Sequence, residues 1–176
     1  MNENFDWPLF INRLWERENA QGLRRVEGKG GYRNGRYYPY KTPNGNVDIG
    51  PGFDLAHQSK EFRETAQKQG FTKEELDSII KQRLKNEGQY FYKRIVKEGG
   101  DPNKLTNNVF GGLLDMFWQL GNGLYQNYPN FWKAVAKQDY EGMQRESVVL
   151  YKDPDGTYHE DTGRRDFRNR TYFKKA

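Results

Sequence analysis

The chain has 176 residues, a formal net charge of +5 and 34% hydrophobic residues, among them 11 Phe, 12 Tyr and 4 Trp. This length suits one domain whose core depends heavily on aromatic rings. The absence of cysteine excludes disulfides and thiolate metal sites, and two isolated histidines disfavour a His-rich metal cage, so no metal site is expected. No apolar run reaches transmembrane length and no secretion-signal pattern opens the chain, which predicts a soluble protein without stable membrane insertion. The basic balance suggests an anionic partner without selecting one.

Residues 1–27 are expected to form an N-terminal helix. Asp6 can cap it, Pro8 suits its first turn, and an apolar stripe follows at helical spacing. Gly28 supplies a residue that commonly stops a helix, which leaves Glu27 in the last turn. The helix dipole disfavours a carboxylate there, so the helix end should raise the pKa of Glu27.

Residues 28–56 change character, because glycines and prolines alternate with tyrosines. The pairs Asn34-Gly35 and Asn44-Gly45 are hairpin signals, which predict a small antiparallel sheet. From residue 57 to 176 helical patterns dominate: a capping box at Thr72 to Glu75, a nearly apolar central helix, one or two further helices and a basic terminal helix. The predicted class is α+β, a small sheet lobe followed by a larger helical lobe with a cleft between them.

Two carboxylates are candidates for catalysis. Alternation along a strand places Asp48 on the face opposite Val47 and Ile49, so it faces the cleft if these neighbours pack on the core. A protonated Glu27 opposite an ionised Asp48 is the minimal equipment for cleaving a glycosidic bond. Judged by spacing alone, a solvated helix-end residue that pairs with Arg24 or Lys29 is the commoner role for such a Glu, because Glu-Gly pairs are frequent.

The segment "PYKTPNGNVDIGPGF" resembles the sheet of the phage-type lysozymes, glycoside hydrolase family 24, which typically reads A-Y-x-D-P-x-G-x-x-T-I-G-Y-G-H. The "RRVEG" stretch is similar to the family's catalytic E-G pair and matches it at Glu27. Further helices of the family are similar to "FTKEELDSIIKQRL", "LLDMFWQLGNG", "YPNFWKAVAKQDYEGMQRE" and "GRRDFRNRTYF". The resemblance runs in order from about residue 20 to the C-terminus.

The chain departs from the family pattern at three positions. Thr42 stands where the family has its second catalytic Asp, Asp48 stands where it has a Thr near the attacking water, and Phe53 stands at its His position. Because the exchange keeps one carboxylate and one hydroxyl on the cleft, we predict that Asp48 is catalytic and that Thr42 supports it. The family position of Asp48 favours a base in an inverting attack, although a nucleophile in a retaining reaction stays open.

The resemblance implies a muramidase, a lysozyme that hydrolyses the β-1,4 bond between N-acetylmuramic acid and N-acetylglucosamine in peptidoglycan without metal or cofactor. It also implies a phage endolysin, held in the host cytoplasm until a holin releases it to the cell wall. We expect a monomer that binds glycan strands and no nucleic acid, since the arginines are not interleaved with the aromatics of a reader motif. Gln119, Tyr40 and Asp54 are predicted to contact the substrate.

Two alternatives remain open at this stage. A catalytically inactive wall-binding module on a lysozyme scaffold would explain Thr42, and a virion-associated or secreted antibacterial lysozyme would keep the chemistry. The basic terminal run suits anionic envelope polymers or an ordinary charged helix face equally well; its members are Arg164, Arg165, Arg168, Arg170, Lys174 and Lys175.

Overall fold

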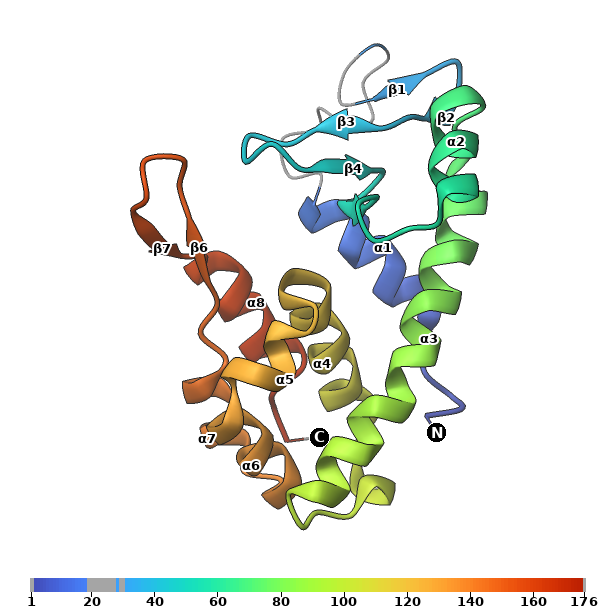
Figure 1. Cartoon of the computed structure of the whole chain (residues 1–176). Helices are drawn as coiled ribbons and strands as arrows, with labels where there is room; N and C mark the ends of the chain where they lie inside the picture. The colour runs from blue at the N-terminus through green and yellow to red at the C-terminus, as the bar shows by residue number, and fades with distance from the viewer. Residues whose placement is uncertain (1, 19–27, 29–30, 176) are drawn as a thin grey trace. The chain divides into compact units, whose positions relative to one another are not determined.

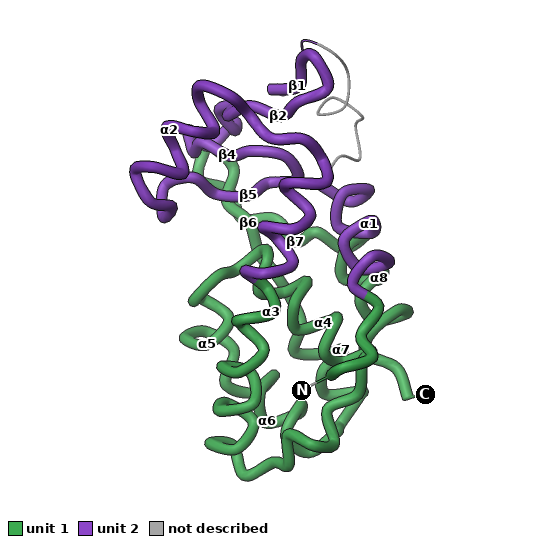
Figure 2. Tube along the Cα trace, turned by 90° about the vertical axis from the view of Figure 1, so that its right-hand side faces the viewer, with its two compact units in different colours: residues 1–6, 84–176 green, residues 7–83 purple. Residues whose placement is uncertain are grey.

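The computed structural model describes residues 2–18, 28 and 31–175 (Figure 1). It combines helices with small antiparallel sheets, in keeping with the predicted α+β class. Two compact units divide the chain, residues 7–83 and residues 1–6 with 84–176 (Figure 2). Their boundary falls inside the long helix α3 (Lys73–Lys97). None of the described helices combines the length and apolarity that a membrane span requires.

The unit of residues 7–83 begins with helix α1 (Trp7–Glu18), which starts directly after Asp6 as predicted. Its apolar stripe is buried and consists of Phe10, Ile11, Leu14 and Trp15. The Trp15 ring lies 4.9 Å from the ring of Tyr37, and its indole nitrogen donates to Asp77 of α3. A large aromatic side chain therefore ties the first helix to both the sheet region and α3.

The sheet region contains two separate antiparallel sheets. The first is the hairpin of β1 (Tyr32–Arg33) and β2 (Arg36–Tyr37), whose turn residues Asn34 and Gly35 have φ of 52° and 70°. Positive φ at both positions is the type I′ geometry that an Asn-Gly pair favours, so this predicted turn is confirmed. The second sheet has the order β3-β4-β5, with β3 at Tyr40–Lys41, β4 at Val47–Ile49 and β5 at Phe53–Asp54.

Two helices follow the sheets. Helix α2 (Lys60–Lys68) begins at Ser59, whose hydroxyl accepts from the backbone N–H of Phe62. Helix α3 begins with the predicted capping box: the Glu75 carboxylate accepts from Thr72 N at 2.9 Å, and Thr72 Oγ1 accepts from Glu75 N at 3.2 Å.

The unit of residues 1–6 and 84–176 is mainly helical. Its central helix α4 (Asn107–Leu120) is buried from Val109 to Phe117 and packs against α5 (Gly123–Asn127) and α8 (Thr162–Thr171). Gly112 allows this packing, because a Cβ atom there would collide with the ring of Phe173. The helices after α3 are η1 (Pro102–Lys104), α4 (Asn107–Leu120), α5 (Gly123–Asn127), α6 (Pro129–Lys137), α7 (Tyr140–Glu146) and α8 (Thr162–Thr171).

A hairpin between α7 and α8 was not predicted. Strands β6 (Leu150–Lys152) and β7 (Tyr158–Glu160) pair around an Asp-Pro-Asp-Gly turn, and the hairpin extends away from the helices of its unit (Figure 1). Its large side chains are exposed, with Tyr151 at 50% and Tyr158 at 64%. Apart from this hairpin, the regular elements described after residue 57 are helices, in keeping with the prediction that helical patterns dominate there.

Candidate functional site

Three predicted site residues form one row across the sheet β3-β4-β5. Tyr40 of β3 pairs with Asp48 of β4, and Asp48 pairs with Asp54 of β5. Directly paired residues of an antiparallel sheet project from the same face. The register thus brings together Asp48, which was predicted to be catalytic, and Tyr40 and Asp54, which were predicted to contact the substrate.

Asp48 and Asp54 form the close kind of cross-strand pair. The backbone N–H of Leu55 donates to Val47 O at 3.0 Å, so the hydrogen-bonded positions flank this pair and do not include it. In such pairs the Cα atoms lie about 4.5 Å apart and the side chains approach closely. Both residues are partly exposed. The sheet therefore presents two adjacent carboxyl groups that solvent can reach.

The surroundings of Asp48 differ in part from the prediction. Ile49 is fully buried, as expected, but Val47 is 37% exposed and does not pack on the core. The premise that both neighbours face the core is wrong, because Val47 lies next to the exposed turn at residues 42–46. Asp48 still lies opposite the buried Ile49.

Asp54 has two further partners within its own loop. Its Oδ1 accepts from Ala56 N at 2.8 Å, and its Oδ2 lies 2.6 Å from His57 Nδ1. The His57 side chain is 86% exposed, in line with a solvated loop residue. These contacts orient the Asp54 carboxyl group at the end of β5.

Thr42 lies at the start of the β3–β4 turn. Its backbone N–H donates to Asn46 O at 2.8 Å, and its Oγ1 accepts from Asn46 N at 3.2 Å. By alternation it shares a face with Tyr40, so it neighbours the carboxylate row. Its hydroxyl stabilises the turn, and a role beside Asp48 in catalysis stays a prediction.

The Tyr40 hydroxyl donates to Gly50 O at 3.2 Å, which fixes the ring on the same sheet. Glu27 lies outside the described residues, so its predicted position at a helix end, its partners and its role remain predictions.

Gln119 belongs to a buried charged cluster of the helical unit. Its Oε1 accepts from Arg168 Nη1 at 2.6 Å, and Arg168 also lies 3.3 Å from Asp115. Arg164 reaches the other carboxylate oxygen of Asp115 at 3.3 Å. Asp115 is fully buried and Arg168 is 1% exposed. We call Asp115, Gln119, Arg164 and Arg168 the Asp115 cluster.

This cluster revises the interpretation of the basic terminal run. Arg164 and Arg168 hold Asp115, and Arg165 holds Glu160 at 2.9 Å. Arg164, Arg165 and Arg168 thus form internal ion pairs, so these three do not make up a solvated face for an anionic polymer. The sequence carried one signal for the cluster, an Asp within an otherwise apolar helix, but its partners could not be named.

Arg168 also influences a neighbouring tyrosine. Burial raises the pKa of Tyr128, while the positive charge of Arg168 acts in the opposite direction. The Tyr128 hydroxyl donates to Val148 O at 2.7 Å, just before the β6–β7 hairpin. Burial likewise raises the pKa of Tyr92, against a hydrogen bond at Asn2.

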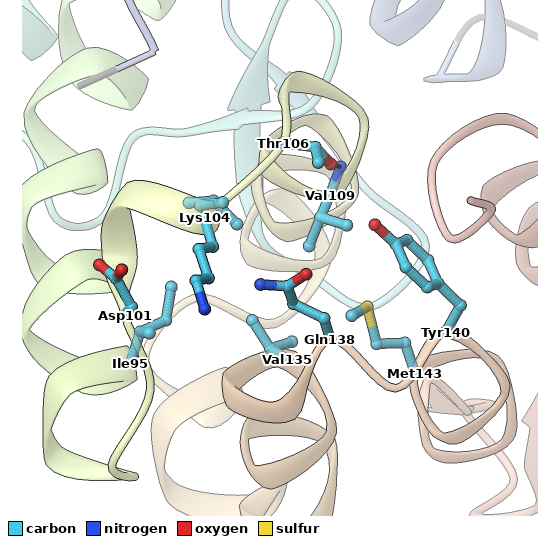
Figure 3. Close-up of a pocket in the computed structure, with 10 residues that line it drawn as sticks. Ile95, Asp101, Lys104, Thr106, Val109, Val135, Gln138, Tyr140 and Met143 are labelled. Carbon is cyan, nitrogen blue, oxygen red and sulfur yellow. Dashed lines mark hydrogen bonds between the residues drawn. The ribbon is translucent and has the colours of Figure 1, made fainter. Parts of the chain in front are cut away.

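The described residues contain no group of three or more His, Asp or Glu side chains placed to hold a metal ion. A small cavity lies in the helical unit, among Asp101, Lys104, Gln138 and Tyr140 (Figure 3). It has room for no more than about one water molecule. None of the predicted site residues lines it, so it provides no substrate site.

No protein-family model matches the chain, and no match is found among curated proteins or solved structures. The resemblance to phage-type lysozymes therefore rests on the motifs of this sequence alone.

Proposed function

We propose that this protein is a peptidoglycan hydrolase of the lysozyme type, which cleaves the β-1,4 bond between N-acetylmuramic acid and N-acetylglucosamine. The observation that carries the proposal is the row of Asp48 and Asp54 on one accessible face of a small sheet. Glycosidases need carboxyl groups that can reach the substrate, and both of these are partly exposed to solvent with Tyr40 in the same row. The motif resemblance at Glu27 supplies the opposing acid.

In the proposed reaction Glu27 donates a proton to the leaving glycosidic oxygen, and Asp48 accepts a proton from the attacking water. Water attack opposite the leaving group inverts the anomeric centre, whereas direct attack by a carboxylate would retain it. Asp54 lies beside Asp48 and is the alternative base. Thr42 supports the water through its position next to Tyr40. No metal or cofactor takes part in this scheme.

The setting is part of the same proposal. A phage endolysin would remain in the host cytoplasm until a holin admits it to the wall, and would act there as a monomer on glycan strands. A virion-associated or secreted lysozyme would use the same chemistry.

Mass analysis of digested peptidoglycan tests the activity. Reducing-end muramic acid in the soluble fragments supports a muramidase, and an anhydro end would reveal a lytic transglycosylase. Co-sedimentation of the protein with cell walls, without cleavage, would favour a binding module. Thr42 supports this alternative, because it places a hydroxyl where the lysozyme pattern has a carboxylate.

Glu27→Gln is the matched variant, since it keeps the shape but removes the donated proton. We expect wall clearing to fall by at least about 100-fold, the scale of general acid catalysis. The helix-end prediction also implies that this variant folds with unchanged or slightly higher stability. Wild-type clearing by Glu27→Gln would end the glycosidase proposal.

A further inference from the structure

The outward face of α3 in the helical unit carries three lysines among polar and apolar side chains. We call this face the lysine face; it consists of six exposed residues, Lys85, Gln89, Tyr90, Lys93, Val96 and Lys97. At 100° per residue they fall within an arc of about 140° on one side of the helix. Lys93 lies near the middle of this arc, with its Nζ 5.5 Å from the Tyr90 ring centroid.

No exposed acid lies among these lysines in this segment of the helix. Glu87, the only acid between Lys85 and Lys97, is 5% exposed and accepts from the Tyr125 hydroxyl at 2.7 Å. Glu98 follows the segment, but it holds Arg94 at 2.8 Å, and each side chain is only 15% exposed. The positive charge of the lysine face is therefore not neutralised from its own helix.

Two exposed apolar groups accompany the charges. Tyr90 is 50% exposed and Val96 is 59% exposed. Tyrosine rings favour the headgroup level of a bilayer, and lysine stems lie along apolar surface while their ammonium groups remain in water. This combination suits a planar anionic surface with an apolar interior better than a hydrated polymer.

We propose that the lysine face docks this protein on the surface of an anionic phospholipid bilayer. The charge complementarity is direct, because three exposed lysines along about 18 Å of helix face the same way. The contrast with α8 supports this assignment, since its Arg164, Arg165 and Arg168 pair with Asp115 and Glu160 of the same unit. Docking is peripheral, since none of the helices in the described part of the chain is long and apolar enough to cross the bilayer.

Co-sedimentation with vesicles tests the proposal without requiring hydrolysis, so it can fail independently of the proposed activity. Wild-type protein should pellet with vesicles of 30% phosphatidylglycerol in phosphatidylcholine and not with pure phosphatidylcholine. Lys85→Gln, Lys93→Gln and Lys97→Gln together should lower the partition coefficient by about 100-fold, about five-fold for each lysine. Circular dichroism of each variant confirms that it is folded.

The matched control replaces three exposed lysines elsewhere in the unit, Lys133, Lys137 and Lys174, by Gln. It removes the same charge and should retain most of the binding. Equal losses in the two triple variants would overturn the proposal, as would absence of wild-type binding to anionic vesicles. Loss of duplex DNA binding in the lysine-face variant, with vesicle binding unchanged, would assign the face to nucleic acid and also overturn it.

Discussion

The two acidic sites of this protein differ in what surrounds the carboxyl group. Asp115 is fully buried and meets two guanidinium groups, whereas Asp48 is partly exposed and lies opposite a second acid, Asp54. A buried charge is tolerated only when charged and polar partners satisfy it, so the Asp115 cluster serves packing. A close pair of accessible carboxyl groups contributes little to stability and is suited to chemistry. The comparison predicts that stability and activity depend on different acids.

Asp115→Asn should produce the largest loss of stability. It leaves the buried Arg168 and its neighbour Arg164 without their carboxylate, which we expect to cost about 3–5 kcal/mol of unfolding free energy. Denaturant unfolding followed by circular dichroism measures this. Asp48→Asn is the control and should change the free energy by about 1 kcal/mol or less. Similar losses in the two variants would break the distinction between the sites.

Activity should instead depend on the two acids of the sheet. We expect Asp48→Asn to lower peptidoglycan cleavage by at least about 100-fold, and Asp54→Asn to lower it less. Turbidity clearing measures both, and proton NMR of the product anomers reads the stereochemistry. Full activity in Asp48→Asn together with loss in Asp54→Asn would move the base to Asp54.

Substitutions at Thr42, alone and combined with Asp48→Thr, test whether residue 42 also takes part in cleavage. Thr42→Ala should only weaken cleavage. Thr42→Asp combined with Asp48→Thr should recover more activity than Asp48→Thr alone, because the sheet again carries a carboxylate next to Tyr40. No recovery in the double variant would show that Thr42 does not reach the reacting atoms.

The pH dependence of stability in the alkaline range gives a smaller expected effect, in the helical unit. Burial raises the pKa of Tyr128, so the unfolded chain loses this proton first, above about pH 10. The contribution of this group to stability is present below that pH and is lost as pH rises through the folded-state pKa. Tyr128→Phe does not titrate. It also loses the hydrogen bond to Val148 O, which contributes about 1 kcal/mol to the free energy of unfolding. In thermal melts, wild type should exceed Tyr128→Phe at pH 8 and lose that advantage above about pH 10; a constant difference would contradict the assignment.

The smallest expected effects on stability come from substitutions in the turns of two hairpins, β3–β4 and β6–β7. The turns Thr42-Pro43-Asn44-Gly45 and Asp153-Pro154-Asp155-Gly156 share one geometry, with the last glycine donating to the first carbonyl oxygen at 2.9 Å. Gly45 has φ of 84° and Gly156 has φ of 90°, and neither has a close steric neighbour. Alanine at either position should cost about 1 kcal/mol. Only Gly45→Ala should also reduce cleavage, since its hairpin carries Asp48; equal activity losses would remove that link.

Local chemistry made part of this structure readable from the sequence. The Asn34-Gly35 turn, the capping box at Thr72 and the buried stripe of α1 depend on residues a few positions apart. The Asp-Pro-Asp-Gly turn carried the same kind of signal as Thr-Pro-Asn-Gly. It was missed because the helical pattern before it was extended to residue 151. These elements follow from backbone preference and periodicity, which act within one or two turns of chain.

Tertiary structure decided which side chains meet. The sequence named Asp48 and Asp54 but could not pair them, because a register shift of one residue would place them on opposite faces. It also gave the terminal arginines as a possible anion-binding face, whereas Arg168 reaches Asp115 across 53 positions of sequence. Contacts of that separation are set by how α4 and α8 pack. Burial, which makes one carboxylate structural and leaves another available for chemistry, arises only when distant segments come together.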